Sequence, residues 1–284
     1  MIMPKLLDGK KIAAQIMESV SKTVVSLPSR PVLAIVLATT NESTLAYVNK
    51  IRKTAEKAGI EARLVNLTEN TDSGAFLERI KKLAKDTATH GIIIQTPLKH
   101  DIDIDGAREL IPLAKDIDGA SPLSAGRLGG GLDAFAPATA QAVIEILNGY
   151  DIDPAGKHAV VVGRSRIIGK PVAGLLVERD ATVTVCHSKT ENLAFYTESA
   201  DVLVVAAGKA HLITKQHIDA AKGTVIIDVG TNFVNDRMVG DVDFIELENV
   251  AGAITPVPGG VGPVTVAVLL RNTLDAYLKQ HSDS

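Results

Sequence analysis

The residues best suited to chemistry lie in a glycine-bounded loop, Gly163–Gly169, that follows the apolar run Val160–Val162. A helix-like pattern begins directly after the second glycine. A strand that turns into a helix in this way presents backbone N–H groups and a helix N-terminus to a phosphate. Arg164 adds a positive charge to the loop, and Ser165 adds a hydroxyl. We therefore predict a nucleotide site here, although the loop lacks the G-x-G-x-x-G fingerprint and an ordinary strand-to-helix turn is the alternative.

The residues after the next apolar run favour NADP over NAD. An NAD site usually has an acidic residue about 20 residues beyond the glycine loop, where it binds the ribose 2′-hydroxyl. The corresponding segment here, Cys186–Thr190, offers Ser188 and Lys189 instead. Together with Arg164 these groups suit a 2′-phosphate, the alternative being that both cations are solvated surface charges. Cys186 is expected to be a small buried residue rather than a nucleophile.

Two further apolar runs end at glycine. One ends at Ala207 and Gly208, and the other continues through Asp228 to Gly230 and Thr231. Ligands of open α/β sheets bind beyond the carboxyl ends of the strands, and glycine lets a ring approach the backbone closely. We expect these residues to contact the same dinucleotide.

The elements that position these loops alternate between strand and helix, which predicts an α/β fold with parallel sheets. The expected helices are 9–26, 43–58, 73–85, 169–179 and 264–279, and the expected strands are 32–37, 62–67, 91–95, 158–162, 181–186, 201–207 and 223–229. The glycine-rich segment 116–137 is expected to be a linker or an active-site loop between domains.

Composition restricts the class of protein. The 284 residues carry a formal net charge of -3 and only 3% aromatic residues, which argues against nucleic acid as a partner. A single cysteine excludes a disulfide within the chain and a cysteine zinc cluster, and the histidine spacing indicates no metal site. No apolar run has the length of a signal peptide or a membrane span, so we expect a cytoplasmic protein with no membrane partner.

Several motifs together resemble the methylenetetrahydrofolate dehydrogenase/cyclohydrolase family. They are 163–171, Cys186-His187-Ser188, 240–244, 255–263, Tyr47-Val48, the 91–98 segment with Gln95 and Pro97, and Lys115-Asp116-x-Asp118-Gly119. The resemblance spans nearly the whole chain. It implies two α/β domains with a cleft between them: a folate-binding catalytic domain, 1–136, to which the last helix, 264–284, returns, and a Rossmann-like, doubly wound NAD(P) domain, 137–263. It also implies a homodimer.

The family resemblance implies two reactions: oxidation of 5,10-methylenetetrahydrofolate by NAD(P) and hydrolysis of the methenyl product to 10-formyltetrahydrofolate. Asp118 would accept hydrogen bonds from the pterin, Tyr47 would pack on the folate rings, and Gln95 would reach the reacting centre. The other residues implied in folate binding are Ile51, Pro97, Pro258, Gly259 and Gly260. The residues implied in NADP binding are Gly163, Arg164, Ser165, Ile168, Ser188, Ala207, Gly208, Gly230 and Thr231.

One departure from the family pattern concerns hydrolysis. The family has a catalytic lysine four residues after the tyrosine, one turn along the same helix face, whereas Ile51 stands there in this chain. Ile51 cannot transfer a proton or bind a water. Lys50 lies one position earlier, rotated by about 100°. We expect an intact dehydrogenase with weak or absent hydrolysis; the alternatives are a bifunctional enzyme that uses Lys50 and a binding scaffold without turnover.

Overall fold

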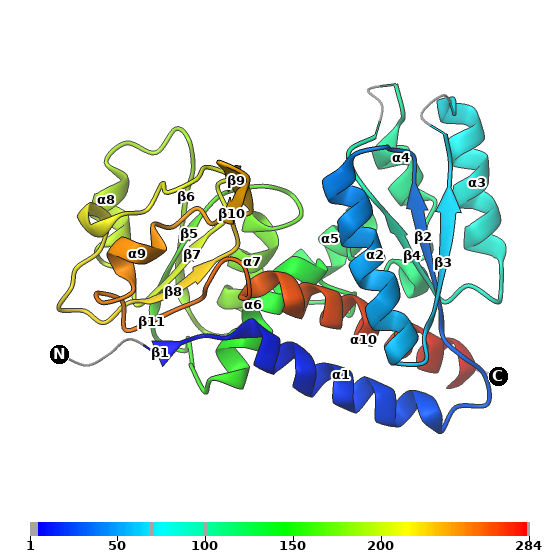
Figure 1. The fold of residues 1–284 in the computed structure, drawn as a ribbon, viewed down its shortest axis with the longest axis horizontal. Helices are drawn as coiled ribbons and strands as arrows, with labels where there is room; N and C mark the ends of the chain where they lie inside the picture. The colour runs from blue at the N-terminus through cyan, green and yellow to red at the C-terminus, as the bar shows by residue number, and fades with distance from the viewer. Residues whose placement is uncertain (1–4, 69–70, 99–100, 283–284) are drawn as a thin grey trace. The chain divides into compact units, whose positions relative to one another are not determined.

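The computed structural model of the chain describes residues 5–68, 71–98 and 101–282. The chain forms two compact units (Figure 1). The first unit comprises Ala14–Ala138 and Val266–Ser284, and the second comprises Met1–Ala13 and Thr139–Thr265. The domain limits given above, 1–136 and 137–263, stay a prediction.

A three-stranded parallel sheet forms the centre of the first unit, in the order β3-β2-β4. β2 (Val32–Leu37) and β4 (Gly91–Ile94) are buried along their whole length, as their uninterrupted apolar sequences require. β3 (Glu61–Asn66) is a partly exposed edge strand. The carboxyl ends of β2 and β4 lie side by side, so residues that follow these strands share one edge of the sheet.

Helices cover this sheet. They are α1 (Gly9–Val25), α2 (Glu42–Lys57), α3 (Ser73–Lys85), α4 (Ile104–Glu109), the 3-10 helix η1 (Leu113–Lys115), α5 (Pro122–Gly129) and α10 (Val261–Ser282), with α1 and α10 also contributing to the second unit. Phe76 and Ile80 of α3 pack with Ala107 of α4 against one face of the sheet. α3 has an apolar stripe at helical spacing, so this face follows from the sequence.

The segment 116–137, expected to lack regular structure, contains the short helix α5. Ser121 caps this helix, since its hydroxyl accepts the N–H of Ser124 at 3.1 Å, and Pro122 occupies the first turn. A serine followed by proline is a helix-start signal. The five glycines of the surrounding residues 119–131 obscured it.

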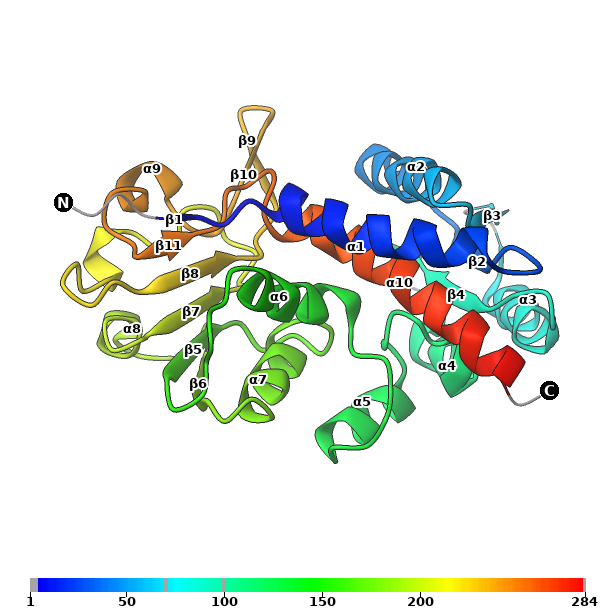
Figure 2. The same cartoon turned by 90° about the horizontal axis from the view of Figure 1, so that it is seen from below.

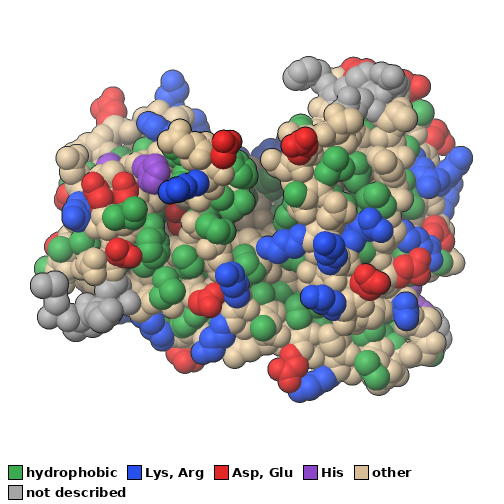
Figure 3. Space-filling view, viewed as in Figure 1, with side chains coloured by type: hydrophobic (Ala, Val, Ile, Leu, Met, Phe, Trp, Pro, Cys, Tyr) green, Lys and Arg blue, Asp and Glu red, His purple; other side chains and the backbone are tan. Residues whose placement is uncertain are grey.

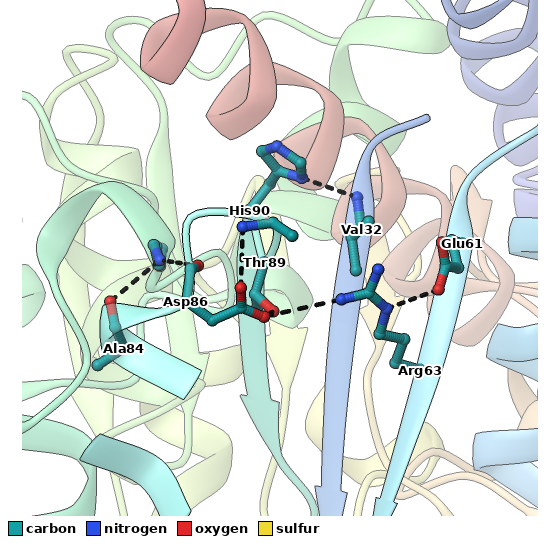
Figure 4. Close-up of polar contacts among 9 residues, drawn as sticks. Val32, Glu61, Arg63, Ala84, Asp86, Thr89 and His90 are labelled. Carbon is teal, nitrogen blue, oxygen red and sulfur yellow. Dashed lines mark hydrogen bonds and ion pairs between the residues drawn. The ribbon is translucent and has the colours of Figure 1, made fainter. Parts of the chain in front are cut away.

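Polar contacts fasten the amino ends of the three strands, at the edge opposite to the strand ends that matter for function (Figure 4). His90 accepts the N–H of Val32 through Nδ1 at 3.0 Å. Burial lowers the pKa of His90 to about 4, so the imidazole is a neutral acceptor near pH 7. Asp86 accepts the hydroxyl of Thr89 at 2.7 Å and faces Arg63 at 3.7 Å. These contacts fix where the strands begin.

Lys115 joins this anchored edge to the segment that follows it. Its ammonium donates to the carbonyl oxygens of Ala84 at 3.0 Å and Asp86 at 2.7 Å. The side chain is buried, and burial lowers its pKa. Lys115 thereby fixes the start of the turn that carries Asp116 and Asp118.

The second unit contains a six-stranded sheet in the order β1-β11-β8-β7-β5-β6, with every pairing parallel. Its strands are β1 (Lys5–Leu6), β5 (His158–Val162), β6 (Thr182–Cys186), β7 (Val202–Val205), β8 (Val225–Asp228) and β11 (Ala253–Ile254). The accompanying helices are α6 (Ala138–Gly149), α7 (Gly169–Val177), α8 (Leu193–Thr197), η2 (Lys215–His217) and α9 (Phe244–Leu247). This doubly wound order confirms the predicted α/β fold class.

Strand order places a switch point beside β5. The chain moves from β5 to β6 on one side and then returns to β7 on the other side. The carboxyl ends of β5 and β7 therefore diverge into loops on opposite sides, which is where ligands of doubly wound sheets bind. A hairpin of β9 (Asn232–Val234) and β10 (Arg237–Val239), not foreseen in the sequence, projects from this unit (Figure 2).

Within the described part of the chain, no helix is both long and apolar enough to cross a bilayer. The same residues contain no cluster of three or more His, Cys, Asp or Glu side chains that could hold a metal ion. On the described residues of the face in Figure 3, basic side chains are interspersed with acidic ones.

Candidate active site

The glycine loop after β5 is tightly closed. Gly163 has φ +138, and a side chain there would collide with the carbonyl oxygen of Ala206 in the loop after β7. A side chain at Gly169 would collide with the backbone of Gly163 itself. Both positions therefore require glycine, and the loops after β5 and β7 touch at the switch point.

Ser165 organises this loop from within. Its hydroxyl oxygen accepts the N–H groups of Ile168 at 3.2 Å and Gly169 at 3.3 Å, and its carbonyl accepts Lys170 N–H at 3.1 Å. The serine, predicted to bind the cofactor, thus uses its lone pairs on the entry to α7 and keeps its O–H as a donor. The side chain of Arg164 is exposed in the same loop.

The turn after β6 lies beside the glycine loop, because Gly163 donates its N–H to the carbonyl of Cys186 at 2.8 Å. Thr190 closes the turn, its hydroxyl accepting the N–H of His187 at 2.8 Å. Ser188 and Lys189 are left exposed at the tip. Cys186 is buried, and burial raises the pKa of its thiol, which agrees with its predicted structural role.

The remaining predicted cofactor residues lie on the loops after β7 and β8. Ala207, Gly208 and Thr231 are exposed, whereas Gly230 is buried. A side chain at Gly208 would meet open space, so nothing in the described chain fills the volume beside this glycine. The two glycine positions of the first loop and the space at Gly208 fit a flat dinucleotide lying along the strand ends.

One buried carboxylate, missed in the sequence, holds both of these loops. Asp241 accepts the backbone N–H groups of Ala207, Gly208 and Lys209, and it also accepts the side-chain amide of Asn232. The motif 240–244 contains this residue, and the motif was the only signal for it.

In the first unit, α2 carries the residues on which the hydrolysis question depends. Asn41 caps the helix by accepting the N–H of Thr44 at 3.0 Å, and the Thr44 hydroxyl donates to the carbonyl of Thr96 at 3.2 Å. That second bond ties α2 to the loop after β4, in which Gln95 is partly buried and Pro97 is exposed. The sequence did not reveal this bond.

Tyr47 lies on the margin of the buried face of α2. Thr44, Val48, Ile51 and Ala55 form that face. Tyr47 is partly buried, and burial together with the nearby Asp118 charge raises the pKa of its phenol, which stays protonated at neutral pH.

Ile51 and Lys50 differ sharply in their surroundings. Ile51 is 0% exposed and belongs to the packed interior, whereas Lys50 is exposed. From Tyr47, Ile51 is rotated by about 40° toward the centre of the buried face, and Lys50 by about 60° away from it. The structure therefore places Lys50 on the solvent side of Tyr47.

Asp118 is the most perturbed carboxyl group of the first unit. Burial and the adjacent Asp116 raise its pKa to about 7, while the N–H of Ala138 and the positive charge of Arg108 act in the opposite direction. Asp118 therefore interacts electrostatically with Tyr47 of α2 and with Arg108 of α4. A carboxyl group whose pKa is raised by burial and by a neighbouring like charge is typical of a ligand-binding site.

Asp116 is a scaffold for Asp118. Its buried carboxylate accepts the N–H groups of Ala120 at 3.1 Å and Ser121 at 3.0 Å and the Ser124 hydroxyl at 2.6 Å. Gly119 has φ +57, and a side chain there would collide with the backbone of Phe135. The turn therefore has one conformation, with Asp118 at its centre.

Pro258, Gly259 and Gly260, predicted to bind the substrate, lie in the second unit. Gly259 has φ +114, and a side chain at Gly260 would come within 2.6 Å of the Pro256 carbonyl oxygen. The structure brings Tyr47 near Asp118 in the first unit and places Gln95 in the loop after β4, and the role of 258–260 stays a prediction.

A glycine loop at a switch point, joined in one chain to a second α/β unit with an aspartate of raised pKa, is the arrangement of a two-domain α/β enzyme that binds a dinucleotide. Two family models match the chain: "Tetrahydrofolate dehydrogenase/cyclohydrolase, catalytic domain" over residues 7–118, and "Tetrahydrofolate dehydrogenase/cyclohydrolase, NAD(P)-binding domain" over residues 137–281. The chain belongs to the tetrahydrofolate dehydrogenase/cyclohydrolase family.

Relatives of known name and structure match along the whole chain. "Bifunctional protein FolD 1" of Rhodococcus jostii is 48% identical and covers 99% of this chain and 96% of its own. The FolD methylenetetrahydrofolate dehydrogenase/cyclohydrolase of Campylobacter jejuni has a TM-score of 0.94 at 39% identity, covering 97% and 99%. The Trypanosoma brucei enzyme, solved with NADP and an inhibitor, has a TM-score of 0.93 at 36% identity, covering 98% and 99%.

Proposed function

We propose that this protein oxidises 5,10-methylenetetrahydrofolate to 5,10-methenyltetrahydrofolate with NADP, and that it hydrolyses the methenyl product weakly or not at all. The names of the related enzymes support the oxidation reaction. The complete burial of Ile51, one turn after Tyr47, supports the weak or absent hydrolysis.

The second unit supplies the dinucleotide site. The glycine loop 163–169 receives phosphate groups at the positive end of α7, and Arg164 faces the 2′-phosphate together with Ser188 and Lys189. Gly208 leaves room for a planar ring beside the strand ends. When bound, NADP supplies the acceptor for the hydride.

The first unit holds the pterin. Asp118 accepts hydrogen bonds from the donor-rich edge of the ring, and this requires the ionised carboxylate. Arg108 favours that charged form, and the N–H of Ala138 does so as well. Tyr47 packs on the ring, and Gln95 presents a neutral amide to the reacting centre. Hydride loss leaves a cation that its own nitrogens stabilise, so positioning is the main requirement.

Hydrolysis makes a different demand on the site. Water must add to the methenyl carbon and lose a proton, which a basic amine in contact with that carbon would assist. Ile51 has no polar atom, and the exposed Lys50 points to the solvent side of α2. A bifunctional enzyme that relies on Lys50 is therefore disfavoured by the position of this residue.

Initial rates with purified protein test the first half of the proposal. NADPH formation from 5,10-methylenetetrahydrofolate should exceed the blank without enzyme, and NADP should be preferred to NAD. If no NADPH forms, the protein is not a dehydrogenase, and the alternative function, folate or nucleotide binding without turnover, is favoured instead.

We also propose a homodimer in the cytoplasm. Among the described residues β3 pairs only with β2, so its outer edge offers free backbone groups, and Leu64 on this strand is 39% exposed. An open strand edge of this kind is suited to pairing with a second copy. Sedimentation analysis of the wild type and of Leu64→Asp tests it: the dimer should dissociate in the variant, and a monomeric wild type would refute the proposal.

A further inference from the structure

We propose that Asp241 is a positioning residue for the dinucleotide, holding the loops after β7 and β8 in the conformation that accepts it. This inference rests on the proposed function of the second unit. Asp241 is not expected to touch the ligand, because its side chain is 0% exposed.

The carboxylate of Asp241 has every acceptor position occupied. Oδ2 accepts the N–H of Ala207 at 2.6 Å and of Gly208 at 2.8 Å, while Oδ1 accepts the N–H of Lys209 and the amide of Asn232, both at 2.8 Å. A carboxylate has about four lone-pair sites, so these four donors saturate it. Hydrogen bonds to a charged acceptor are among the stronger ones.

Three of the four donors come from an exposed loop, the one after β7. Ala207, Gly208 and Lys209 are exposed, yet one buried group fixes their three consecutive N–H groups. The neighbouring Ala206 packs against Gly163 of the phosphate loop. Asp241 thus fixes the loop after β7, which contacts the phosphate loop, relative to the buried sheet.

A second buried carboxylate fixes Asp241 itself. Asp228, at the end of β8, accepts the N–H groups of Asp241 and Val242, each at 3.0 Å, and of Gly230 at 2.9 Å. Side chains at Gly230 and Gly240 would collide with the carboxylates of Asp241 and Asp228, respectively. The two aspartates and two glycines form one packed assembly, which includes the predicted cofactor contact Gly230 and adjoins Thr231 in the sequence.

Fixing these loops before the ligand arrives reduces the ordering cost of binding. Loss of the carboxylate should therefore weaken the dinucleotide complex without changing the environment of Tyr47, Gln95 and Asp118, which lie in the first unit. A purely structural role would instead lower stability and leave the affinity of the folded protein unchanged.

The experiment compares Asp241→Asn with Asp201→Asn. Asp201 also accepts a backbone N–H, that of His158 at 2.8 Å, but at the amino edge of the same sheet. In Asp241→Asn the amide cannot accept at two of the four sites, and the dissociation constant for NADP should rise about tenfold or more. The KM for the folate substrate should not change. Asp201→Asn should bind NADP like the wild type even if it melts at a lower temperature.

Equal NADP affinity in folded Asp241→Asn and wild type would overturn the inference. If that variant does not fold, hydrogen exchange in the wild type decides: the amides of Ala207, Gly208 and Lys209 should exchange far more slowly than those of the exposed hairpin turn at Asn235 and Asp236. Equally fast exchange refutes a fixed loop. A wild type that does not bind NADP would refute the proposed function instead.

Discussion

Ile51 lies one helical turn after Tyr47 and is fully buried, while Tyr47 itself reaches the charge of Asp118. The position one turn after Tyr47 on α2 therefore carries an aliphatic side chain that belongs to the packed interior. Because side chains on a helix lean toward its N-terminus, a lysine at position 51 would have its stem in the packed interior and would extend back along α2 toward Tyr47. We propose that this relationship separates the two reactions of the family in this chain.

Ile51→Lys should gain hydrolysis. The new amine would assist proton transfer from water, and we expect enzyme-dependent hydrolysis of 5,10-methenyltetrahydrofolate to rise by about tenfold to a hundredfold. Burying part of the ammonium should lower the free energy of unfolding by roughly 1 to 3 kcal/mol. Lys50→Ala is the matched control and should leave both reactions unchanged. Loss of hydrolysis in Lys50→Ala would instead identify Lys50 as the functional amine.

Asp118 should make folate binding dependent on pH. Its pKa of about 7 in the ligand-free protein means that the carboxyl is largely protonated at pH 6 and ionised at pH 8. The KM for 5,10-methylenetetrahydrofolate should therefore fall as the pH rises through 7. In Asp118→Asn this dependence should disappear, and the KM should rise by roughly 30-fold, or about 2 kcal/mol. A pH-independent KM in the wild type would contradict the assignment.

The same substitution should stabilise the ligand-free protein. Folding raises the pKa of Asp118 from 3.8 to about 7, so the folded state binds the proton more tightly. The stability that this group contributes is complete below about pH 4 and is lost as the pH rises through 7. Asp118→Asn, which does not titrate, should thus gain about 2 to 4 kcal/mol relative to the wild type at pH 8. Denaturant unfolding at about pH 5 and 8 measures the difference.

Arg164→Ala should reduce the preference for NADP over NAD. The guanidinium is exposed in the phosphate loop, where it can reach a 2′-phosphate. We expect the ratio of kcat/KM for the two cofactors to fall about tenfold or more, mainly through the KM for NADP. Lys170→Ala removes an exposed charge from the start of α7 and serves as the control. An unchanged ratio in Arg164→Ala would remove this residue from 2′-phosphate recognition.

Lys115→Met should destabilise the first unit and weaken folate binding together. The ammonium satisfies two carbonyl oxygens, those of Ala84 and Asp86, from a buried position. Its loss should cost roughly 2 kcal/mol and loosen the turn that carries Asp118. Chemical denaturation and the folate KM provide the two readouts. Full stability with a raised KM would indicate a direct contact with substrate instead.

Much of the fold could be predicted because its strands are short apolar runs bounded by glycine. The predicted limits of 32–37, 73–85 and 158–162 agree with the structure to the residue. The strands expected at 201–207 and 223–229 are shorter in the structure, because their last residues turn into loops held by Asp241 and Asp228. Such buried side-chain contacts have no periodic signature.

The candidate site was only partly predictable for the same reason. Glycines at 163, 169 and 119 are recognisable because close backbone approach requires them. The environment of Asp118 depends on Arg108, which lies on a separate helix, and that of the cofactor loop depends on Asp241, which lies 32 to 34 residues further along the chain. Solitary charged residues give no sign of the partner that they meet after folding, so their roles require the structure.

The most direct test follows both reactions in one preparation of the wild-type protein. With 5,10-methylenetetrahydrofolate and NADP, NADPH should form while 5,10-methenyltetrahydrofolate accumulates, and added methenyl compound should hydrolyse no faster than in buffer alone. Rapid enzyme-dependent hydrolysis, with no accumulation of the methenyl compound, would contradict the assignment of Ile51 as the residue that separates the two activities.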